Sequence, residues 1–522
     1  MPKKNILFIL TDQERQPIHM PKGFSLPGRD RLAAMSLTFN NYHTVTAPCT
    51  PSRSVIFTGH HTVINGMLDN TSMPFIEPMN PDIPTLGDML QAAGYACAYR
   101  GKWHLADIKE TQEPRHTTEG DMAPYGFPDY QHSGDMTLMA WEGWLHDRTI
   151  TAEALHWLRG WLSGDREKPF FLVVGLVNPH DIMTYDTDED RKTQTSPEGA
   201  LAPIRGVPPD ETYRKTWSAG LPPSFDEDAS TKPAAHAEFM RINDANFGEI
   251  PLDRRDMWER LVDYYLNAQV DVDRNIQALV DALESFGLLE DTIIVRTADH
   301  GEQAGAHGLH QKGPWIYRET TNVPLMIAHP DGPKGTTTEA LASSLDLAPT
   351  LMGLAGLTAD EQRALFPGLP GNDLTCLIPG AAELVGAERR DAPRDAILFM
   401  YTALSTIDAD FSTGGAGAPD LTKRGLLLGI FDGRYKFARY FSPAYQEVPV
   451  TIEQLRENCD LELYDLDRDE NEAHNLAVRS DCDELIVRLN AKLNALVARE
   501  VGSELLPIEI PSDVSTLRGP LS

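Results

Sequence analysis

The chain alternates short apolar runs with longer stretches in which apolar residues recur at helical spacing. Continuous apolar runs of this length are typical of strands that are buried on both faces of a sheet. The segments that predict strands are NILFIL, YACAYRG, PFFLVVGLV, DTIIVRTA and NVPLMIAHP. Helical spacing predicts helices at residues 83–93, 149–164, 254–287 and 343–356, the third of which is long enough for one helix or two.

This alternation of strand and helix predicts an α/β fold, with a mostly parallel central sheet and helices on both faces. Polar residues directly follow four of the predicted strands, in the sequences TDQ, GKWH, NPH and ADHGE. In an open parallel sheet, ligands bind beyond the carboxyl ends of the strands. These four loops are therefore the first candidates for a functional site.

The pattern changes from about residue 360, where proline, glycine and alanine become frequent. Beyond this connector, the Asp-Gly pair within residues 425–441 predicts a β-hairpin. Residues 484–501 have the spacing of a closing amphipathic helix. The predicted organisation is a larger α/β domain at residues 1–375, a smaller α+β domain at residues 376–500, and a tail at residues 501–522 that is a candidate arm for a homo-oligomer.

Composition and charge limit which partners and which cellular compartment the chain is expected to have. The 522 residues carry a formal net charge of −31, which predicts no sequence-independent binding to nucleic acid or acidic membranes, although a locally positive pocket could still hold a small anion. No apolar stretch is long enough to span a membrane, and the first apolar run is too short for a signal peptide. The five cysteines are sparse and unpatterned, which favours a reducing cytoplasm over a disulfide framework.

One of these cysteines, Cys49, lies in the sequence TAPCTPSRSVIFTG. Thr50 can cap a helix, Pro51 suits the first helical position and Gly59 can end the helix, so Cys49 is expected at a helix N-terminus, which favours an anion. A small buried residue is the ordinary interpretation of such a cysteine. A thiolate nucleophile is the second, but the spacing to Arg53 is too short for a thiol phosphatase, and cysteine protease signatures are absent.

A third interpretation comes from resemblance. CTPSR resembles the C-x-P-S-R signature of type I sulfatases, the formylglycine-dependent family of the alkaline phosphatase superfamily. Further segments resemble sulfatase elements in family order and cover residues 6–476: ILFILTDQ, GKWHLA with Ala106 in place of glycine, VNPHD, TADHGEQAGAHGLHQKG, and LYDLDRDENEAHNLA with Glu470 in place of proline. The resemblance implies an alkaline-phosphatase-like fold and an arylsulfatase-type hydrolase that acts on aryl or alkyl sulfate monoesters.

The resemblance also implies one divalent metal ion, with Ca²⁺ as the first expectation and Mn²⁺ as the second. The implied ligands are Asp12, Gln13, the modified Cys49, Asp299 and His300. Many sulfatases have Asp at the position of Gln13 and Asn at that of His300, so this chain resembles the choline-sulfatase and phosphonate-monoester-hydrolase branch. Oxygen-rich shells suit Ca²⁺ or Mg²⁺, whereas an imidazole makes Mn²⁺ or Zn²⁺ more competitive. Each of these residues also has an ordinary structural interpretation. Asp12 could cap the end of a strand, and Asp299 and His300 could form a turn.

In this family a formylglycine-generating enzyme oxidises the cysteine to an aldehyde, which implies such an enzyme as a partner during maturation. The hydrated aldehyde attacks sulfur, and collapse of the resulting hemiacetal releases sulfate. The resemblance implies that Arg53 holds the diol and that Lys102 and Lys312 bind the oxygens of a small anionic ester. It also implies that His104 is the base for the collapse and that His180 protonates the leaving group, with Lys312 as the alternative acid. Histidine suits both roles because its pKa lies near neutral pH.

Two alternatives stay open at this point. One is an enzyme of the same superfamily that acts on phosphonate monoesters or phosphodiesters, or on both these and sulfates. The other is an inactive relative that binds anions or partners without turnover. Substrate choice is expected to depend on loops outside the family motifs, at residues 14–28, 106–147 and 181–245. The acidic run at residues 186–190 could meet a cationic substrate end, but a solvated loop is the commoner fate of a charge run.

Overall fold

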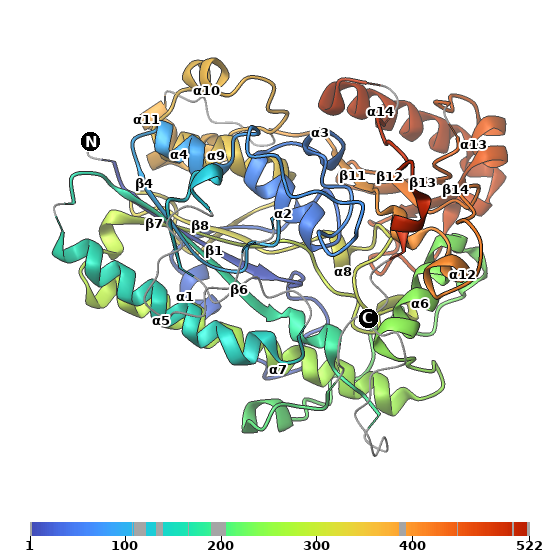
Figure 1. Ribbon diagram of the computed structural model, residues 1–522, viewed down its shortest axis with the longest axis horizontal. Helices are drawn as coiled ribbons and strands as arrows, with labels where there is room; N and C mark the ends of the chain where they lie inside the picture. Colours follow the sequence, from blue (N-terminus) through green and yellow to red (C-terminus); the bar gives the residue numbers. More distant parts are fainter. Residues whose placement is uncertain are drawn as a thin grey trace.

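The computed structural model describes residues 3–106, 108, 122–131, 139–164, 166–188, 205–385, 393–445, 447–503 and 506–518. At its centre is an eight-stranded sheet with the order β5-β4-β6-β1-β7-β8-β2-β9 (Figure 1). The strands in that order are β5 (Asp129–Gln131), β4 (Ala96–Gly101), β6 (Phe170–Pro179), β1 (Asn5–Asp12), β7 (Thr292–Ala298), β8 (Leu325–Ala328), β2 (Leu37–Phe39) and β9 (Thr336–Thr338). The strands from β5 to β7 are parallel, whereas β8 runs antiparallel to both of its neighbours. The predicted mostly parallel sheet is therefore confirmed.

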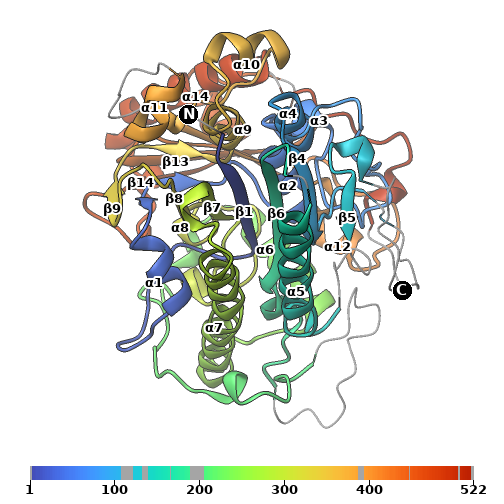
Figure 2. The ribbon, with the colours of Figure 1, turned by 90° about the vertical axis from the view of Figure 1, so that its left-hand side faces the viewer.

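Strand β1 is buried along its whole length, and its residues 6–10 are all apolar because both faces of the strand are covered. Leu7 and Ile9 pack in the core on the side of the long helices, whereas Phe8 and Leu10 pack in the core on the opposite side. The first side is covered by α1 (Pro27–Ala33), α5 (Glu142–Ser163) and α7 (Arg255–Ser285), and the second by α2 (Cys49–Thr58), α4 (Leu86–Ala92) and α9 (Leu347–Leu354) (Figure 2). The stretch that could have formed one helix or two is the single helix α7, of 31 residues.

The C-terminal part of the chain forms a four-stranded antiparallel sheet at one end of the molecule (Figure 1). Its strands are β11 (Ile397–Tyr401), β12 (Leu426–Phe431), β13 (Tyr435–Phe441) and β14 (Asp460–Asp465). Side chains alternate along β11, so that Leu398 and Met400 pack under the closing helix α14 (Asp483–Val501), while Phe399 and Tyr401 face the larger domain. The predicted hairpin is the β12–β13 turn, and the predicted closing helix is α14.

The remaining strands and α-helices have at most 14 residues. They are β3 (Tyr42–His43), β10 (Ala342–Ser343), α3 (Thr62–Asn65), α6 (Ala234–Phe247), α8 (Arg318–Thr321), α10 (Ala359–Leu365), α11 (Pro379–Val385), α12 (Ala409–Ser412) and α13 (Ile452–Asn458). Leu374, Ile378 and Ala381 pack in the core of the larger sheet. The boundary at residue 375 thus falls within a segment that packs on the first domain, and the boundary stays a prediction.

A buried polar network joins the small sheet to the larger domain. The carboxylate of Glu462 accepts hydrogen bonds from the hydroxyls of Tyr317 (2.9 Å), Tyr440 (2.6 Å) and Tyr464 (2.6 Å). Glu472 pairs with Lys436 at 2.7 Å and accepts a hydrogen bond from the backbone N–H of residue 318 at 2.7 Å. The late segment LYDLDRDENEAHNLA therefore braces the chain that follows the polar loop after β7.

The described part of the tail lies against its own chain. Leu517 packs with Leu404 and Phe411, and the guanidinium of Arg518 lies 4.4 Å from the centre of the Phe411 ring. A role of the tail as an oligomerisation arm stays a prediction. Among the residues that the structure describes, no helix is both long and apolar enough to cross a membrane.

Candidate active site

The polar residues that follow the parallel strands converge on the first turn of α2. Asp12 ends β1, Asp299 follows β7, and Cys49 is the first residue of α2. Lys102, which follows β4, places its Nζ atom 2.8 Å from Asp12 Oδ2. His180, which follows β6, is close enough for its charge to affect the pKa of Asp12. The strand-end loops therefore bring these residues together at one edge of the sheet, and their function as a site stays a prediction.

Four side chains form a buried cluster that is suited to a cation. One ligand atom from each of Asp12, Cys49, Asp299 and His300 lies within 4.8 Å of the others. The Cys49 Sγ atom is 3.5 Å from Asp12 Oδ1 and 3.2 Å from His300 Nε2. His300 Nε2 is also 3.8 Å from a carboxylate oxygen of Asp299. In this arrangement Sγ marks the position where a modified residue 49 would present oxygen atoms.

The electrostatics of the cluster fit a divalent ion. Burial alone would lower the pKa of His300, but Asp299 and Cys49 raise it to about 9. Burial alone would raise the pKa of Asp12, but Lys102, His180 and His300 lower it well below its usual value. A protonated imidazole thus balances the carboxylates, and a divalent cation would replace that proton. Two carboxylates with one imidazole suit Ca²⁺, Mg²⁺ or Mn²⁺.

Replacing Asp12 with asparagine should weaken divalent-metal binding by more than the roughly 10- to 100-fold typical of changes to outer-sphere partners. The reason is that the cluster loses one of its two carboxylates while an uncharged amide remains. Metal content measured after dialysis, and the rise in unfolding temperature on adding metal, report the effect.

The matched control is Asp273→Asn, because Asp273 is also buried but caps backbone N–H groups of residues 28 and 29 at 2.8 and 2.9 Å. This control should lose stability and keep its metal. Full metal occupancy in Asp12→Asn would contradict the assignment of the cluster.

Arg53, one turn into α2, is fully buried and connects the cluster to β4 and the loop that follows it. Its Nη1 atom donates to Asp299 Oδ2 at 3.2 Å and lies 3.8 Å from Asp12 Oδ2. Its Nε atom donates to the Trp103 carbonyl at 2.9 Å, and its Nη2 atom donates to the Tyr99 hydroxyl at 3.1 Å and to the Lys102 carbonyl. The guanidinium therefore fixes the start of α2 against the loop that carries Lys102.

The second lysine of the site, Lys312, reaches it through Gln13. The Lys312 ammonium donates to Gln13 Oε1 and also lies 3.0 Å from Met183 Sδ. Gln13 in turn donates from its amide nitrogen to Glu302 Oε2 at 2.5 Å, and from its backbone N–H to Asp299 Oδ1 at 3.0 Å. The structure thus places the amide oxygen of Gln13 against Lys312, and its part as a metal ligand stays a prediction.

Both candidate acid–base histidines are buried beside cations. Burial, with a further contribution from Lys102, lowers the pKa of His104 well below its usual value. Burial and the charges of Lys102 and Lys312 lower the pKa of His180 in the same way. His180 Nδ1 lies 3.8 Å from Glu142 Oε2. Both imidazoles are therefore neutral at neutral pH, which suits a base, whereas a histidine that acts as an acid must first take up a proton.

Glu302 is a residue of the site whose role the sequence did not reveal. Besides Gln13, its carboxylate accepts hydrogen bonds from the backbone N–H groups of Ala304 at 2.9 Å and Gln311 at 2.7 Å. Gln13 and Gln311 have positive φ angles of 65° and 72°, and Ala304 has one of 42°. Such conformations persist only where the surroundings hold them. The motif ADHGE contained Glu302, but nothing in the pattern distinguished a loop brace from a solvated acid.

The expected helix cap at Thr50 is wrong. Helix α2 begins at Cys49, its N-cap residue is Pro48, and no side chain caps it. The Thr50 hydroxyl donates instead to the His104 carbonyl at 2.8 Å. The hydroxyl thus joins the first turn of α2 to the loop that follows β4, while Gly59 ends the helix with a φ of 70°, as expected.

The proposed specificity loops are described only in part. Residues 107, 109–121, 132–138 and 189–204 lie outside the described residues, so half of the segment 106–147 and part of the segment 181–245 do too. Within the acidic run, Glu189 and Asp190 are likewise outside, and Asp186 is buried. No described contact tests a role of this run in substrate binding.

Comparisons with known proteins agree with this geometry. A family model described as Sulfatase matches residues 4–357. The N-acetylglucosamine-6-O-sulfatase of Bacteroides thetaiotaomicron is 28% identical over 409 residues, covering 68% of each chain. The choline-sulfatase of Rhizobium meliloti is 26% identical over 417 residues, covering 77% of this chain and 74% of the relative. The solved phosphonate monoester hydrolase of Silicibacter pomeroyi shares the fold, with a TM-score of 0.66, 19% identity and coverage of 98% of both chains.

Proposed function

Because the chain belongs to the sulfatase family, we propose that it hydrolyses sulfate monoesters to an alcohol and sulfate with an oxygen nucleophile made from Cys49. The observation that carries this proposal is the position of the Cys49 side chain inside the cluster of Asp12, Asp299 and His300. An inert structural cysteine needs no such anionic surroundings, whereas a nucleophile held beside a cation does. Conversion of Cys49 to formylglycine would replace the thiol by the required oxygen atoms.

Asp12, Asp299 and His300 would hold the metal ion together with the modified residue 49, and Gln13 would add its amide oxygen if Lys312 turned toward the substrate. We propose Ca²⁺ first and Mn²⁺ second, because two carboxylates and an amide are hard donors and one imidazole is softer. When bound, the ion would polarise an ester oxygen and make the hydroxyl of residue 49 more acidic.

The cations of the site would bind the three non-bridging oxygens of the ester. Lys102 is buried at the cluster, and burial opposed by the charges of Asp12 and Cys49 leaves its pKa raised, so it stays protonated at neutral pH. Lys312 would exchange its bond to Gln13 for one to the ester. Arg53, which is held from three sides, would keep residue 49 in line with the sulfur atom.

Two neutral imidazoles would move the protons. His104 would accept a proton from a hydroxyl of residue 49, because its lowered pKa keeps its ring unprotonated. His180 would take up a proton from water when the anionic ester binds beside it, and as an imidazolium would donate that proton to the departing alcohol oxygen, with Lys312 as the alternative donor. The buried carboxylate of Glu142 near His180 Nδ1 would stabilise the imidazolium.

The competing proposal is a preference for phosphonate monoesters or phosphodiesters, which the fold shared with a phosphonate monoester hydrolase keeps open. The two are separated by kcat/KM on an aryl sulfate, an aryl phosphonate and a diaryl phosphate that share one leaving group. We expect the sulfate to be the best of the three, because it presents three non-bridging oxygens to the cations of the site, whereas the phosphonate monoester and the phosphodiester each present two. A preference for the phosphonate by several orders of magnitude would contradict the sulfatase assignment.

We further propose that maturation takes place with a formylglycine-generating enzyme, and that the protein works in the cytoplasm. The second proposal is supported by the five cysteines, all of which are free thiols.

A further inference from the structure

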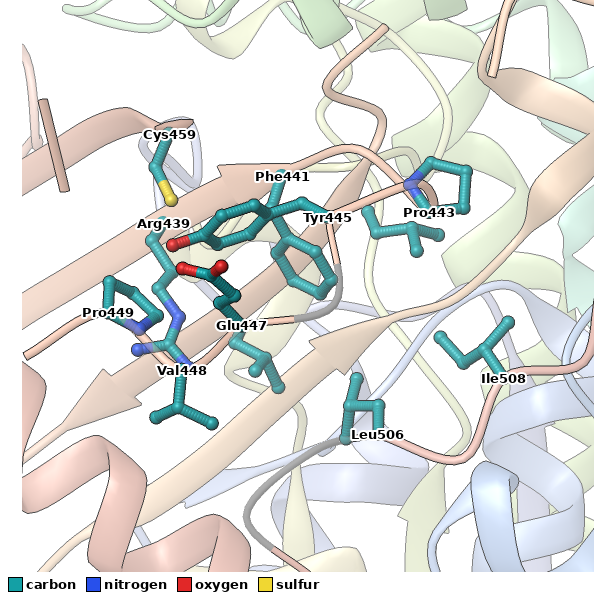
Figure 3. Close-up of a pocket in the computed structure, with 12 residues that line it drawn as sticks. Arg439, Phe441, Pro443, Tyr445, Glu447, Val448, Pro449, Cys459, Leu506 and Ile508 are labelled. Carbon is teal, nitrogen blue, oxygen red and sulfur yellow. The ribbon is translucent and has the colours of Figure 1, made fainter. Parts of the chain in front are cut away.

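A second pocket lies on the outer side of the C-terminal domain and shares no residue with the candidate active site. It lies between β12 and β13, the loop that follows β13, and the tail (Figure 3). It encloses about 40 Å³, and its walls include Leu428, Phe441, Leu506 and Ile508. This volume suits a group of a few heavy atoms, with the rest of a ligand in the open mouth.

The floor of this pocket holds a buried cation. Arg439 of β13 is only 4% exposed. Its Nη1 atom donates to Asn490 Oδ1 at 2.5 Å and to Asn494 Oδ1 at 2.6 Å. Its Nε and Nη2 atoms make no hydrogen bond within the described ranges of the chain, and no carboxylate there forms an ion pair with it. A buried charge without a counter-charge is unfavourable unless something supplies one.

The two asparagines are themselves held in place. Their amide nitrogens donate to the Pro449 carbonyl at 2.7 and 3.1 Å, which turns both amide oxygens toward Arg439. The amides therefore position the guanidinium but bring no negative charge. In keeping with this, burial lowers the pKa of Arg439 to about 10.

A second polar group in the same pocket also lacks a partner. The Tyr445 hydroxyl is enclosed, and no described residue forms a hydrogen bond with it. Figure 3 shows Tyr445 and Arg439 on the same side of the pocket as Cys459, with Leu506 and Ile508 opposite. The guanidinium of Arg439 and the enclosed Tyr445 hydroxyl thus face one cavity whose other walls are largely apolar, which is the arrangement expected of a site for an oxyanion with an apolar body.

We propose that this pocket binds a small organic monoanion, a carboxylate with a short apolar body. The carboxylate would accept hydrogen bonds from Nε and Nη2 of Arg439, a geometry that a planar guanidinium favours, and one from the Tyr445 hydroxyl. The apolar body would lie against Phe441, Leu506 and Ile508. The exposed carboxylate of Glu447 lines the mouth, so a dianion such as phosphate would be disfavoured.

The experiment titrates the full-length protein with acetate, butyrate and benzoate, and with benzamide as the uncharged control, using calorimetry and the shift in unfolding temperature. We expect butyrate and benzoate to bind more tightly than acetate and benzamide not to bind. Arg439→Met should weaken butyrate binding by at least about tenfold, because the charge-assisted bonds are lost, and should leave kcat/KM for a sulfate ester unchanged. Tyr445→Phe should weaken it less.

Glu447 separates the proposal from its main competitor, in which this side chain swings inward and pairs with Arg439. If the pocket awaits a ligand, Glu447→Gln removes a repelling charge, so butyrate binds more tightly and stability is kept. Loss of stability in Glu447→Gln without tighter binding would overturn the proposal. So would butyrate binding that Arg439→Met does not change, since it would then occur elsewhere, for instance at the active-site lysines.

Discussion

Replacing Cys49 with alanine should lower kcat by about 10⁴-fold or more, because the variant has no side chain that can become the oxygen nucleophile. Asp12, Asp299 and His300 remain in this variant, so it should still fold and bind a divalent metal. Initial rates with an aryl sulfate, together with metal content after dialysis, measure the two effects separately.

Cys97→Ala is the matched control for this variant. Cys97 is also buried, at 4% exposure, but it lies in β4 and its thiol donates to the Gly87 carbonyl at 3.4 Å. The control should lose a little stability and keep its kcat. If Cys49→Ala retained more than a small fraction of the wild-type rate, Cys49 would not be the source of the nucleophile.

Arg53→Met should reduce both activity and stability. Removing one partner of a buried ion pair typically costs about 3–5 kcal/mol, because the other partner is left charged and unpaired. Here Asp299 would lose one of its two nearby cations and keep His300, the Trp103 carbonyl would lose a donor, and the Lys102 carbonyl would keep the Tyr99 hydroxyl. The same change frees the start of α2, so kcat should fall as well. Urea unfolding and steady-state kinetics measure the two losses.

Two further variants separate position from charge. Arg100→Met removes another buried arginine, which lies in β4. Its guanidinium pairs with Asp129 of the edge strand β5 at 2.7 Å, away from the metal cluster. This variant should lose stability but keep its kcat. Arg53→Lys keeps the charge but cannot bond to Asp299, Trp103 and Tyr99 together, so it should restore only part of the activity. Wild-type kcat in Arg53→Met would contradict the role given to this residue.

The strands that carry the site were predictable because continuous apolar runs mark strands buried on both faces, and β1 is buried along its whole length. The positions of Asp12 and Asp299 followed, since parallel strands end at one edge of the sheet. The antiparallel direction of β8 could not be predicted, because an apolar run predicts a strand but not its orientation. The partners of side chains were also beyond the pattern, and the Thr50 hydroxyl bonds to the His104 carbonyl instead of capping its helix.

Long-range contacts explain the rest of what the sequence left open. The bond between Lys312 and Gln13 joins residues about 300 positions apart along the chain, and only the folded sheet brings them together. The late motif LYDLDRDENEAHNLA also depends on long-range contacts. Its Glu472 accepts a hydrogen bond from the backbone of residue 318 in the larger domain and pairs with Lys436 in the smaller one. The loop conformations with positive φ at Gln13 and Gln311 depend on Glu302, which local sequence preferences do not reveal.

The most direct test of the central claim is the mass of the peptide that contains Cys49, measured on protein produced in a host that has a formylglycine-generating enzyme. The account predicts the mass of an aldehyde in place of the thiol, and a specific activity that rises in proportion to the modified fraction across preparations. Fully active protein whose Cys49 peptide has the mass of an unmodified thiol would contradict it.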